Sequence, residues 1–283
     1  MRKIEFLISP QDSGMQIRDF LRRFGVSASL MKKLKHTENG ILLNGEFAKT
    51  IEHLNTGDTL TVNIENSGKM PEKLENSSVT AVYDDEDILI LNKPANMPVH
   101  ESRNHRGDTL ANVAACYMEP DTAFRSVYRL DRDTSGLVLI AKNELAASKL
   151  AGKIKKDYYA VCDGILTGEG TVDLPIRRVE ESIIVRGVFD DGERAVTHYT
   201  AVENFGNKTL LRINLETGKT HQIRVHFSHL GHPLLGDSLY GGNCSEIKRQ
   251  ALHCKTISFV HPITEKEMTV DSDFPADFKA ILK

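Results

Sequence analysis

The chain lacks the features of a membrane or secreted protein. Its 283 residues include no apolar run of about eighteen residues, the length that a membrane-spanning helix needs. The first residues, Met1-Arg2-Lys3-Ile4-Glu5-Phe6, contain no apolar stretch followed by a cleavage site, so they do not resemble a secretory leader. From these absences we expect a cytoplasmic protein with no membrane partner.

Cysteine is scarce as well, and its spacing argues against two classes of site. The four cysteines stand far apart, and none forms a Cys-x-x-Cys pair: Cys116, Cys162, Cys244 and Cys254. A disulfide framework or a zinc ribbon needs closer and more regular spacing. We therefore expect reduced and mostly buried thiols.

Several catalytic signatures are missing too. Gly218-Lys219-Thr220 is similar to the end of a phosphate-binding loop, but Ile213 stands where that motif begins with glycine. There is no Gly-x-Ser-x-Gly elbow of a hydrolase. A histidine-rich run lacks the His-Glu-x-x-His spacing of a zinc site: His221, His226, His229 and His232. We expect no ATP use, no metal and no cofactor.

The chain also has no excess of positive charge, since its formal net charge is -3. With 40% hydrophobic and 27% charged residues, its composition is that of a globular protein. A weakly negative net charge does not exclude a nucleic-acid-binding protein, because binding to phosphates needs only a local positive field.

What the chain does contain is a charged loop before a strongly apolar segment. Residues 128–136, Tyr-Arg-Leu-Asp-Arg-Asp-Thr-Ser-Gly, lead into Leu137-Val138-Leu139-Ile140-Ala141. Consecutive apolar residues predict a strand buried on both faces. The simplest interpretation of the loop is a solvated turn whose charges pair with one another. A second polar stretch, residues 217–226, Thr-Gly-Lys-Thr-His-Gln-Ile-Arg-Val-His, favours a functional site instead.

Together the two stretches resemble the signature motifs of the pseudouridine synthases of the ribosomal large-subunit family A type. Further motifs of that family are matched by Leu91-Asn92-Lys93-Pro94, residues 192–199, residues 231–237 and Leu252-His253. The resemblance covers roughly the last two hundred residues, and several ordered motifs are more specific than one. It implies an isomerase that converts uridine to pseudouridine in structured RNA. Large-subunit (23S) ribosomal RNA is the expected substrate, and transfer RNA is the alternative.

The resemblance assigns roles to three residues. Asp131 matches the catalytic carboxylate, which either attacks the anomeric carbon or removes a neighbouring sugar proton; the sequence leaves both routes open. Arg224 matches the basic partner, whose permanent charge favours an ionised carboxylate. Tyr158 matches the active-site tyrosine, on which a flipped base can stack. Asp133 is a weaker candidate for a second carboxylate, and we expect it to cap the Thr134-Ser135-Gly136 turn.

Local geometry adds expectations about the helix that contains Arg224. With Thr220 as N-cap, the helix is predicted to run from His221 to Phe227. Arg224 then shares a face with His221 that can turn towards the site. The opposite, core face is expected to contain Ile223, Phe227 and Leu230. An Arg224 on the surface of an amphipathic helix is the alternative.

Of the other residues near these motifs, one is expected in the core and several are expected to contact the RNA. Tyr159 should point away from Tyr158, because neighbours on a strand alternate in direction. Arg129 matches a position whose side chain fills the space that the flipped base leaves, and a phosphate contact is the alternative. RNA contacts are also expected from Lys219, Thr220 and His221.

Residues 1–65 predict a small α+β module. Apolar spacing predicts one helix over 17–24 and a second over 30–35, followed by an Asn44-Gly45 hairpin and a strand over 59–64. Basic residues cluster on the two helices: Arg22, Arg23, Lys32, Lys33 and Lys35. The module resembles the S4-type RNA-binding domain, and a solvated basic face is the alternative.

A polar linker over 66–78 is predicted to precede a catalytic domain over 79–283. We expect an α+β fold in that domain, with a large mixed, mainly antiparallel sheet flanked by helices and loops. Ala146, Leu150 and Ile154 predict a helix that ends near residues 155–157. We expect the protein to be a monomer.

The chain departs from the family's motifs at three positions, which leaves the subfamily and the target uridine open. Tyr128 replaces a usual histidine, Asn96 a frequent glycine, and Lys219 a common arginine. Two other functions remain as alternatives. One is a non-catalytic RNA-binding or ribosome-assembly protein, and the other is a metal-dependent RNA hydrolase that uses the histidine run.

Overall fold

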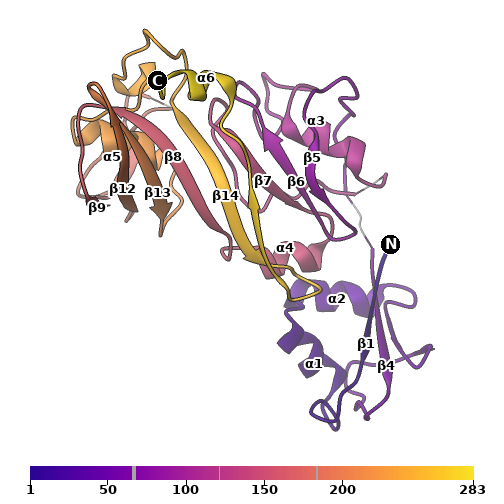
Figure 1. Ribbon diagram of the computed structural model, residues 1–283. Helices are drawn as coiled ribbons and strands as arrows, with labels where there is room; N and C mark the ends of the chain where they lie inside the picture. The colour runs from indigo at the N-terminus through magenta and orange to yellow at the C-terminus, as the bar shows by residue number, and fades with distance from the viewer. Residues whose placement is uncertain (66–67, 121, 183) are drawn as a thin grey trace.

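The computed structural model describes residues 1–65, 68–120, 122–182 and 184–283. The first two residues of the predicted linker, 66 and 67, therefore lie outside the described residues. A small module formed by the first 65 residues lies at one end of a larger body built on a long sheet (Figure 1). No helix among the described residues has the length and apolar character needed to cross a membrane.

The small module consists of a four-stranded sheet and two helices. The strand order is β1-β4-β2-β3, with β1 (Arg2–Leu7), β2 (Ile41–Leu43), β3 (Glu46–Phe47) and β4 (Thr59–Ile64). Asn44 and Gly45 both have positive φ, as a tight hairpin between β2 and β3 requires. The predicted hairpin is confirmed.

Both helices predicted for the small module are present; the first has its predicted range, and the second extends beyond 30–35 by two residues at its start and one at its end. Helix α1 (Ile17–Phe24) ends at Gly25, which adopts the left-handed conformation with φ 104°. Helix α2 (Ala28–His36) is capped by Ser27, whose hydroxyl accepts a hydrogen bond from the Leu30 amide. The apolar faces of both helices are buried in a core that they share with the strands of the module and with Leu145.

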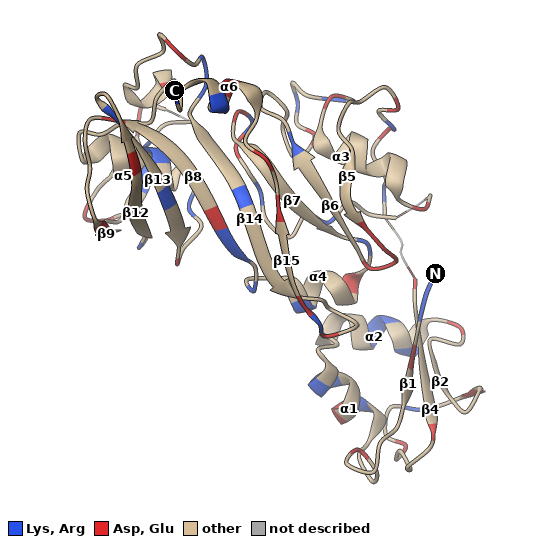
Figure 2. Cartoon of the chain, in the orientation of Figure 1, with Lys and Arg blue, Asp and Glu red and all other residues tan. Residues whose placement is uncertain are grey.

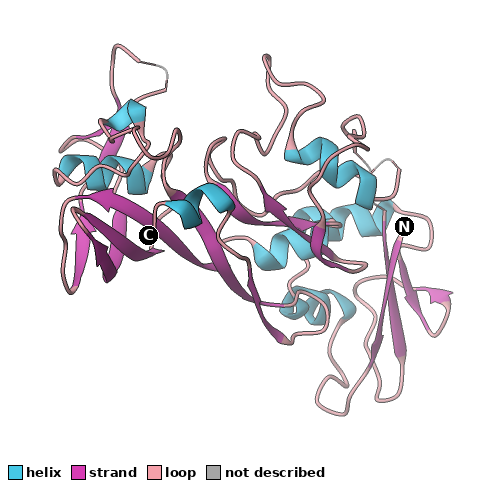
Figure 3. Cartoon of the chain, turned by 45° about the horizontal axis from the view of Figure 1, so that its top comes forward, coloured by secondary structure: helices cyan, strands magenta, loops and turns pink. Residues whose placement is uncertain are grey.

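The larger body contains a nine-stranded mixed sheet in the order β5-β6-β7-β14-β8-β13-β12-β9, with β15 paired to β14. The strands are β5 (Ala81–Asp84), β6 (Ile88–Lys93), β7 (Ser135–Ala141), β8 (Lys155–Asp163), β9 (Glu169–Asp173), β12 (Val196–Phe205), β13 (Lys208–Leu215), β14 (Leu252–Val260) and β15 (Glu267–Asp271). Only β7 and β14 pair in parallel among the described strands, so the expected mixed, mainly antiparallel sheet is confirmed. Figure 3 shows its long strands crossing the molecule, with helices placed around them.

Strand β7 lies in the middle of this sheet, and all seven of its residues are buried. The prediction of a strand buried on both faces is therefore confirmed. Gly136 permits the parallel contact with β14, because it has φ 119° and a Cβ there would lie 2.2 Å from the Cys254 carbonyl oxygen. The charged loop therefore enters β7 at the point where β7 and β14 pair in parallel.

Short helices and a separate hairpin complete the larger body. The helices are α3 (Leu110–Ala114), α4 (Glu144–Leu150), α5 (Gln222–His229) and α6 (Ala276–Ala280), with 3-10 turns η1 (Ala115–Tyr117) and η2 (Ser238–Tyr240). Strands β10 (Ile176–Arg178) and β11 (Arg186–Val188) form a two-stranded sheet. The prediction that the helix after β7 continues to residues 155–157 is wrong. It ends at Leu150, because Gly152 takes φ 70° and β8 begins at Lys155.

Helix α4 lies between the sheet and the small module (Figure 1). Its Leu145 is fully buried in the core of the small module. Lys33 of α2 forms an ion pair with Glu144, and Arg2 of β1 pairs with Asp87 through two hydrogen bonds of 2.9 Å. Part of the predicted linker also packs on the larger body, since Leu74 donates its amide to the Asn112 carbonyl.

Candidate active site

The charged loop and helix α5 meet at a cleft of about 880 Å³. The cleft is lined by every residue that the sequence assigned to catalysis or to contacts near it: Arg129, Asp131, Tyr158, Lys219, Thr220, His221 and Arg224. These residues come from three separate stretches of chain. The two signature stretches therefore form one site, as the resemblance implied.

Asp131 and Arg224 form an ion pair at the floor of this cleft. The Arg224 Nη1 donates to the Asp131 Oδ2 at 3.0 Å. The Asp131 side chain is 26% exposed and the Arg224 side chain 8%. The carboxylate thus faces the cleft, while the guanidinium behind it is shielded from water. The alternative of a surface arginine is wrong, because Arg224 is buried.

A second carboxylate holds the guanidinium from behind. Arg224 Nε and Nη2 donate to the two oxygens of Asp237 at 2.7 and 2.8 Å. Asp237 is only 1% exposed. Burial opposes the charge of Arg224, but the hydrogen bonds and charges of Asp237 and Asp131 outweigh it and raise its pKa. The planar, bidentate pairing with Asp237 fixes the orientation of the Arg224 guanidinium, so that its Nη1 points at Asp131.

Tyr240 packs against this ion pair. The guanidinium carbon of Arg224 lies 4.9 Å from the centre of the Tyr240 ring. The Tyr240 hydroxyl hydrogen-bonds the His221 Nδ1 at 2.8 Å and accepts from the Arg186 amide at 3.0 Å. The other ring nitrogen of His221 lies 3.8 Å from Asp131. Burial lowers the pKa of His221, and Asp131 only partly offsets this effect.

Helix α5 begins differently from the prediction. Thr220 is exposed, and His221 occupies the N-cap position with a left-handed φ of 59°, so the assignment of Thr220 as N-cap is wrong. The buried Gln222 side chain explains this start. It accepts from the Lys219 amide and the Thr217 hydroxyl, each at 2.9 Å. Strain of this kind in a residue other than glycine persists only where surrounding contacts hold it.

The core face of α5 is partly as predicted. Ile223 and Phe227 are buried, whereas Leu230 is 41% exposed, so its assignment to the core is wrong. The reason is that α5 ends at His229, and Leu230 and Gly231 turn the chain away. Arg224 and His221 both reach Asp131, as their shared face predicted.

Tyr158 and Tyr159 point to opposite faces of β8. Tyr158 is 6% exposed and lines the cleft. Burial, with smaller contributions from Cys254 and Asp131, raises its pKa well above the ordinary value, so it remains a neutral phenol. Tyr159 packs edge-on against Phe274 at 5.3 Å, in a different core. The predicted alternation is confirmed.

Lys93 fixes the backbone of the charged loop. Its fully buried ammonium group donates to the carbonyls of Pro94, Met97 and Arg132, at 2.9, 2.8 and 2.8 Å. Burial lowers the pKa of Lys93 to about 7, against the opposing effect of nearby carboxylates. Asn96 lies in the same turn with φ 59°, a conformation that asparagine tolerates better than most residues. This explains how asparagine serves at a position where the resemblance leads one to expect glycine.

The residues after Asp131 are held from the side of β14. The Ser135 hydroxyl hydrogen-bonds the His253 Nδ1 at 2.9 Å, and the Gln250 amide donates to the Thr134 hydroxyl at 3.2 Å. Burial lowers the pKa of His253 to about 4. Asp133 pairs with the Arg132 guanidinium at 2.9 Å instead of capping the turn, where the Thr134 amide donates to the Asp131 carbonyl. The predicted capping role of Asp133 is therefore wrong.

The remaining predicted RNA contacts fall in two places. Arg129 is exposed at the cleft, and Lys219 beside it pairs with Glu193. The five basic residues of the small module that were predicted to contact RNA lie on α1 and α2 (Figure 2). Arg23 pairs with Asp12 and Lys33 with Glu144. Within the described chain no ion pair forms at Arg22, Lys32 or Lys35, all of which are exposed.

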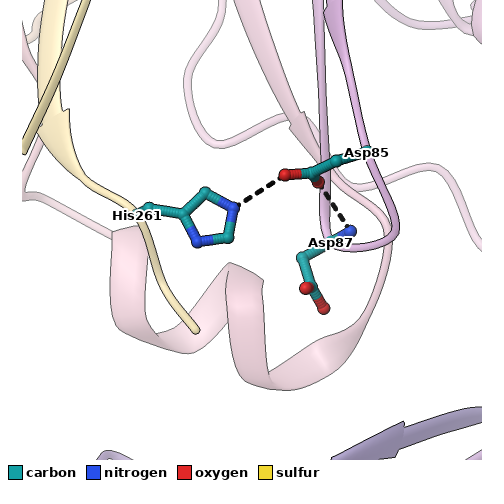
Figure 4. Close-up of side chains that lie close together, drawn as sticks. All are labelled: Asp85, Asp87 and His261. Atoms are coloured by element: carbon teal, nitrogen blue, oxygen red, sulfur yellow. Dashed lines mark hydrogen bonds and ion pairs between the residues drawn. The ribbon is translucent and has the colours of Figure 1, made fainter. Parts of the chain in front are cut away.

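One cluster away from the cleft has the composition of a metal site: Asp85, Asp87 and His261 (Figure 4). The atoms that could bind a metal ion already form hydrogen bonds or ion pairs with other residues of the protein. Asp85 hydrogen-bonds the His261 Nε2 at 2.9 Å, and both oxygens of Asp87 bind Arg2. The other nitrogen of His261 accepts from the Thr264 amide at 3.0 Å. The cluster therefore acts as a junction between the small module and the sheet.

Sequence analysis assigned no role to three residues that contact the site: Asp237, Tyr240 and Lys93. Asp237 and Lys93 both lie within motifs of the resemblance, which is the signal that could have found them. The histidine run gave a misleading signal. The buried His226 bonds Thr197 and the Leu174 carbonyl, and His232 bonds the Asp163 carbonyl, so the run diverges to separate partners.

Known proteins are similar to this chain in sequence and in fold. The sequence model of a family described as RNA pseudouridylate synthase matches residues 87–229. The Bacillus subtilis (strain 168) protein named uncharacterized RNA pseudouridine synthase YjbO is 38% identical over 285 residues, covering 95% of this chain and 99% of that protein. Ribosomal large subunit pseudouridine synthase D of Haemophilus influenzae is 39% identical over 248 residues, covering 80% and 76%. The solved structure of Human RNA Pseudouridylate Synthase Domain Containing 1 has a TM-score of 0.58 at 26% identity, covering 72% and 86%.

Proposed function

The chain belongs to the RNA pseudouridylate synthase family and is an RNA pseudouridine synthase, and we propose that it modifies a uridine of large-subunit ribosomal RNA with Asp131 as its catalytic carboxylate. The assignment of Asp131 as the catalytic carboxylate rests on one observation. Asp131 faces the cleft and is bound from behind by Arg224, which Asp237 fixes in turn. The proposal of a ribosomal RNA substrate rests on relatives such as the ribosomal large subunit pseudouridine synthase D of Haemophilus influenzae. A ribosomal RNA substrate would place the protein in the cytoplasm.

Isomerisation of uridine needs an ionised carboxylate next to the ribose. The Arg224 guanidinium stabilises that ionised form by charge and by a 3.0 Å hydrogen bond. The carboxylate then attacks the anomeric carbon or removes a neighbouring sugar proton. In either case the bond from C1′ to N1 of the base breaks, and the base turns so that C5 bonds to C1′. C5 loses its proton and N1 gains one, so the product is an isomer of the substrate.

The target base must leave its stack in the RNA before this reaction. Tyr158 supplies a neutral aromatic surface beside Asp131 on which the extruded uracil stacks, a contact that contributes about 1–3 kcal/mol per base. Arg129, exposed at the cleft, fills the space that the base leaves or contacts a phosphate. Lys219, Thr220 and His221 line the same wall and contact the RNA strand.

For the small module we propose a separate role in RNA binding. Residues 1–65 form an S4-like domain, and residues 79–283 form the catalytic domain. Support comes from the separate sheet of the module and from its two helices, on which Figure 2 shows basic residues. Arg22, Lys32 and Lys35 on these helices are exposed. Phosphate contacts from such residues add affinity that does not depend on the base sequence.

A pseudouridine map of total RNA tests the substrate. The map is compared between a strain that lacks this protein, the same strain with the wild-type gene restored, and the strain with Asp131→Asn restored. We expect one or a few sites in large-subunit ribosomal RNA to disappear on deletion and to return only with the wild-type gene. Loss of sites in transfer RNA instead would reject the ribosomal substrate. An unchanged map would reject both proposals and favour a binding role.

A further inference from the structure

A lysine in the cleft has no role in the chemistry described so far. Lys156 lies two residues before Tyr158 on β8, and side chains at that spacing share one face of a strand. Both residues line the cleft with Asp131. Residues two apart on a strand are separated by about 6.6 Å, which is comparable to the span of a uracil ring and its carbonyl oxygens.

The ammonium group of Lys156 is positioned without a counter-charge. Its Nζ lies 4.5 Å from the centre of the Tyr128 ring, so the group rests on an aromatic face. Within the described part of the chain no carboxylate pairs with it. The nearest acidic residue along the strand, Asp157, points to the other face, where Arg212 binds it at 3.0 Å.

The neighbouring thiol does not neutralise this cation either. Cys254 lies opposite Tyr158 in the adjacent strand β14. Burial raises the pKa of Cys254 to about 12, so the thiol stays uncharged. Burial also lowers the pKa of Lys156, which shows that water compensates its charge poorly. A half-buried cation with no partner in the protein is typical of a site whose partner is the ligand.

We propose that Lys156 is a further catalytic residue, which binds a carbonyl oxygen of the target uracil and stabilises the negative charge of the base after it separates from the ribose. This role rests on the proposed function. When the bond from C1′ to N1 breaks, the electron pair stays on N1 and its charge is shared with the carbonyl oxygens. A fixed cation at the edge of the stacked base stabilises that charge and the transition state that leads to it.

The position of Lys156 favours the base over a phosphate. Lys156 shares its strand face with the stacking residue Tyr158 and is only partly exposed. Arg129 is exposed at the same cleft and is better placed for the RNA backbone. A phosphate contact would strengthen substrate and transition state equally, whereas a contact with the departing base acts on the rate of the bound complex.

The test compares Lys156→Met with Lys156→Arg and with Lys155→Met, the adjacent lysine, which is exposed. Each full-length variant is mixed in excess with large-subunit ribosomal RNA transcribed with uridine tritiated at C5, and tritium release reports bond formation at C5. We expect Lys156→Met to lower the saturating single-turnover rate about a hundredfold, with RNA affinity within twofold of wild type. Lys156→Arg should recover part of the rate, and Lys155→Met should match wild type.

Thermal unfolding of the same variants separates catalysis from structure. Removing an unpaired, half-buried charge should leave the melting temperature of Lys156→Met equal to wild type or higher. A full rate in Lys156→Met would overturn the proposal, as would a loss of affinity at unchanged saturating rate, which would indicate a phosphate contact. A lower melting temperature that explains the lost rate would indicate a structural role. Wild-type enzyme that releases no tritium would instead count against the proposed substrate.

Discussion

The Arg224 guanidinium donates to the Asp131 carboxylate at 3.0 Å across 93 positions of sequence. This pair joins the loop before β7, in the middle of the sheet, to helix α5, which packs elsewhere on it. Because Asp237 binds the other side of Arg224, the cleft contains a row of alternating charges: carboxylate, guanidinium, carboxylate. Only the first carboxylate is accessible to a substrate.

That accessible carboxylate gives the most direct prediction. Asp131→Asn should keep the fold, because the amide has the same shape, but it removes the charge that the reaction needs. We expect the single-turnover rate to fall by about a thousandfold or more, with RNA affinity within a few-fold of wild type. Tritium release and filter binding measure the two quantities. Isomerisation at the wild-type rate would show that another group is the carboxylate.

Asp237→Asn should destabilise the protein and slow the reaction. The change leaves Arg224, 8% exposed, with one carboxylate instead of two, and breaking a buried ion pair costs about 3 kcal/mol of unfolding free energy. Asp191→Asn, in the exposed pair with Arg177, is the matched control and should cost less than about 1 kcal/mol. Denaturant unfolding measures both. Equal effects of the two changes would mean that Asp237 does not hold Arg224 in solution.

The stability of the protein should depend on pH through His253. Burial lowers its folded pKa to about 4 from 6.5, so below pH 6.5 the unfolded chain binds a proton that the folded chain excludes. The contribution is fully present above pH 6.5 and is lost as the pH falls towards 4, by about 3 kcal/mol in total. Denaturant unfolding between pH 4 and 7 should therefore show a shallower slope for His253→Gln than for wild type. Parallel slopes would mean that His253 binds a proton as readily in the folded protein as in the unfolded chain.

The basic helices of the small module should set the salt dependence of RNA binding. Replacing Arg22, Lys32 and Lys35 together by glutamine should weaken binding at low salt and flatten the plot of log affinity against log salt by about two units. Replacing the exposed Lys153, Lys266 and Lys279 controls for the loss of three charges and should leave the slope near that of wild type. If both triple variants lose the same slope, the module makes no particular contact with RNA.

Local sequence was sufficient where one segment decides its own structure. Gly25 ends α1 and Ser27 caps α2, and Asn44 with Gly45 forms the tight hairpin, because each conformation depends on residues within a few positions. The uniform apolar character of residues 137–141 likewise determined a strand buried on both faces. The motifs were sufficient to identify Asp131, Tyr158 and Arg224 as residues that share a site.

Tertiary contacts decided the rest, because they depend on side chains that are remote in sequence. The start of α5 at His221, not at Thr220, follows from the Gln222 side chain, which also reaches back to the carbonyl of Val196. The pairing of Asp237 with Arg224 and the contact of Lys93 with the Arg132 carbonyl form only when separate loops pack together, so the motifs show these residues but not their partners. Sequence alone determined which chemical groups the protein has. The fold determined which of them face the substrate and which are buried to hold the others in place.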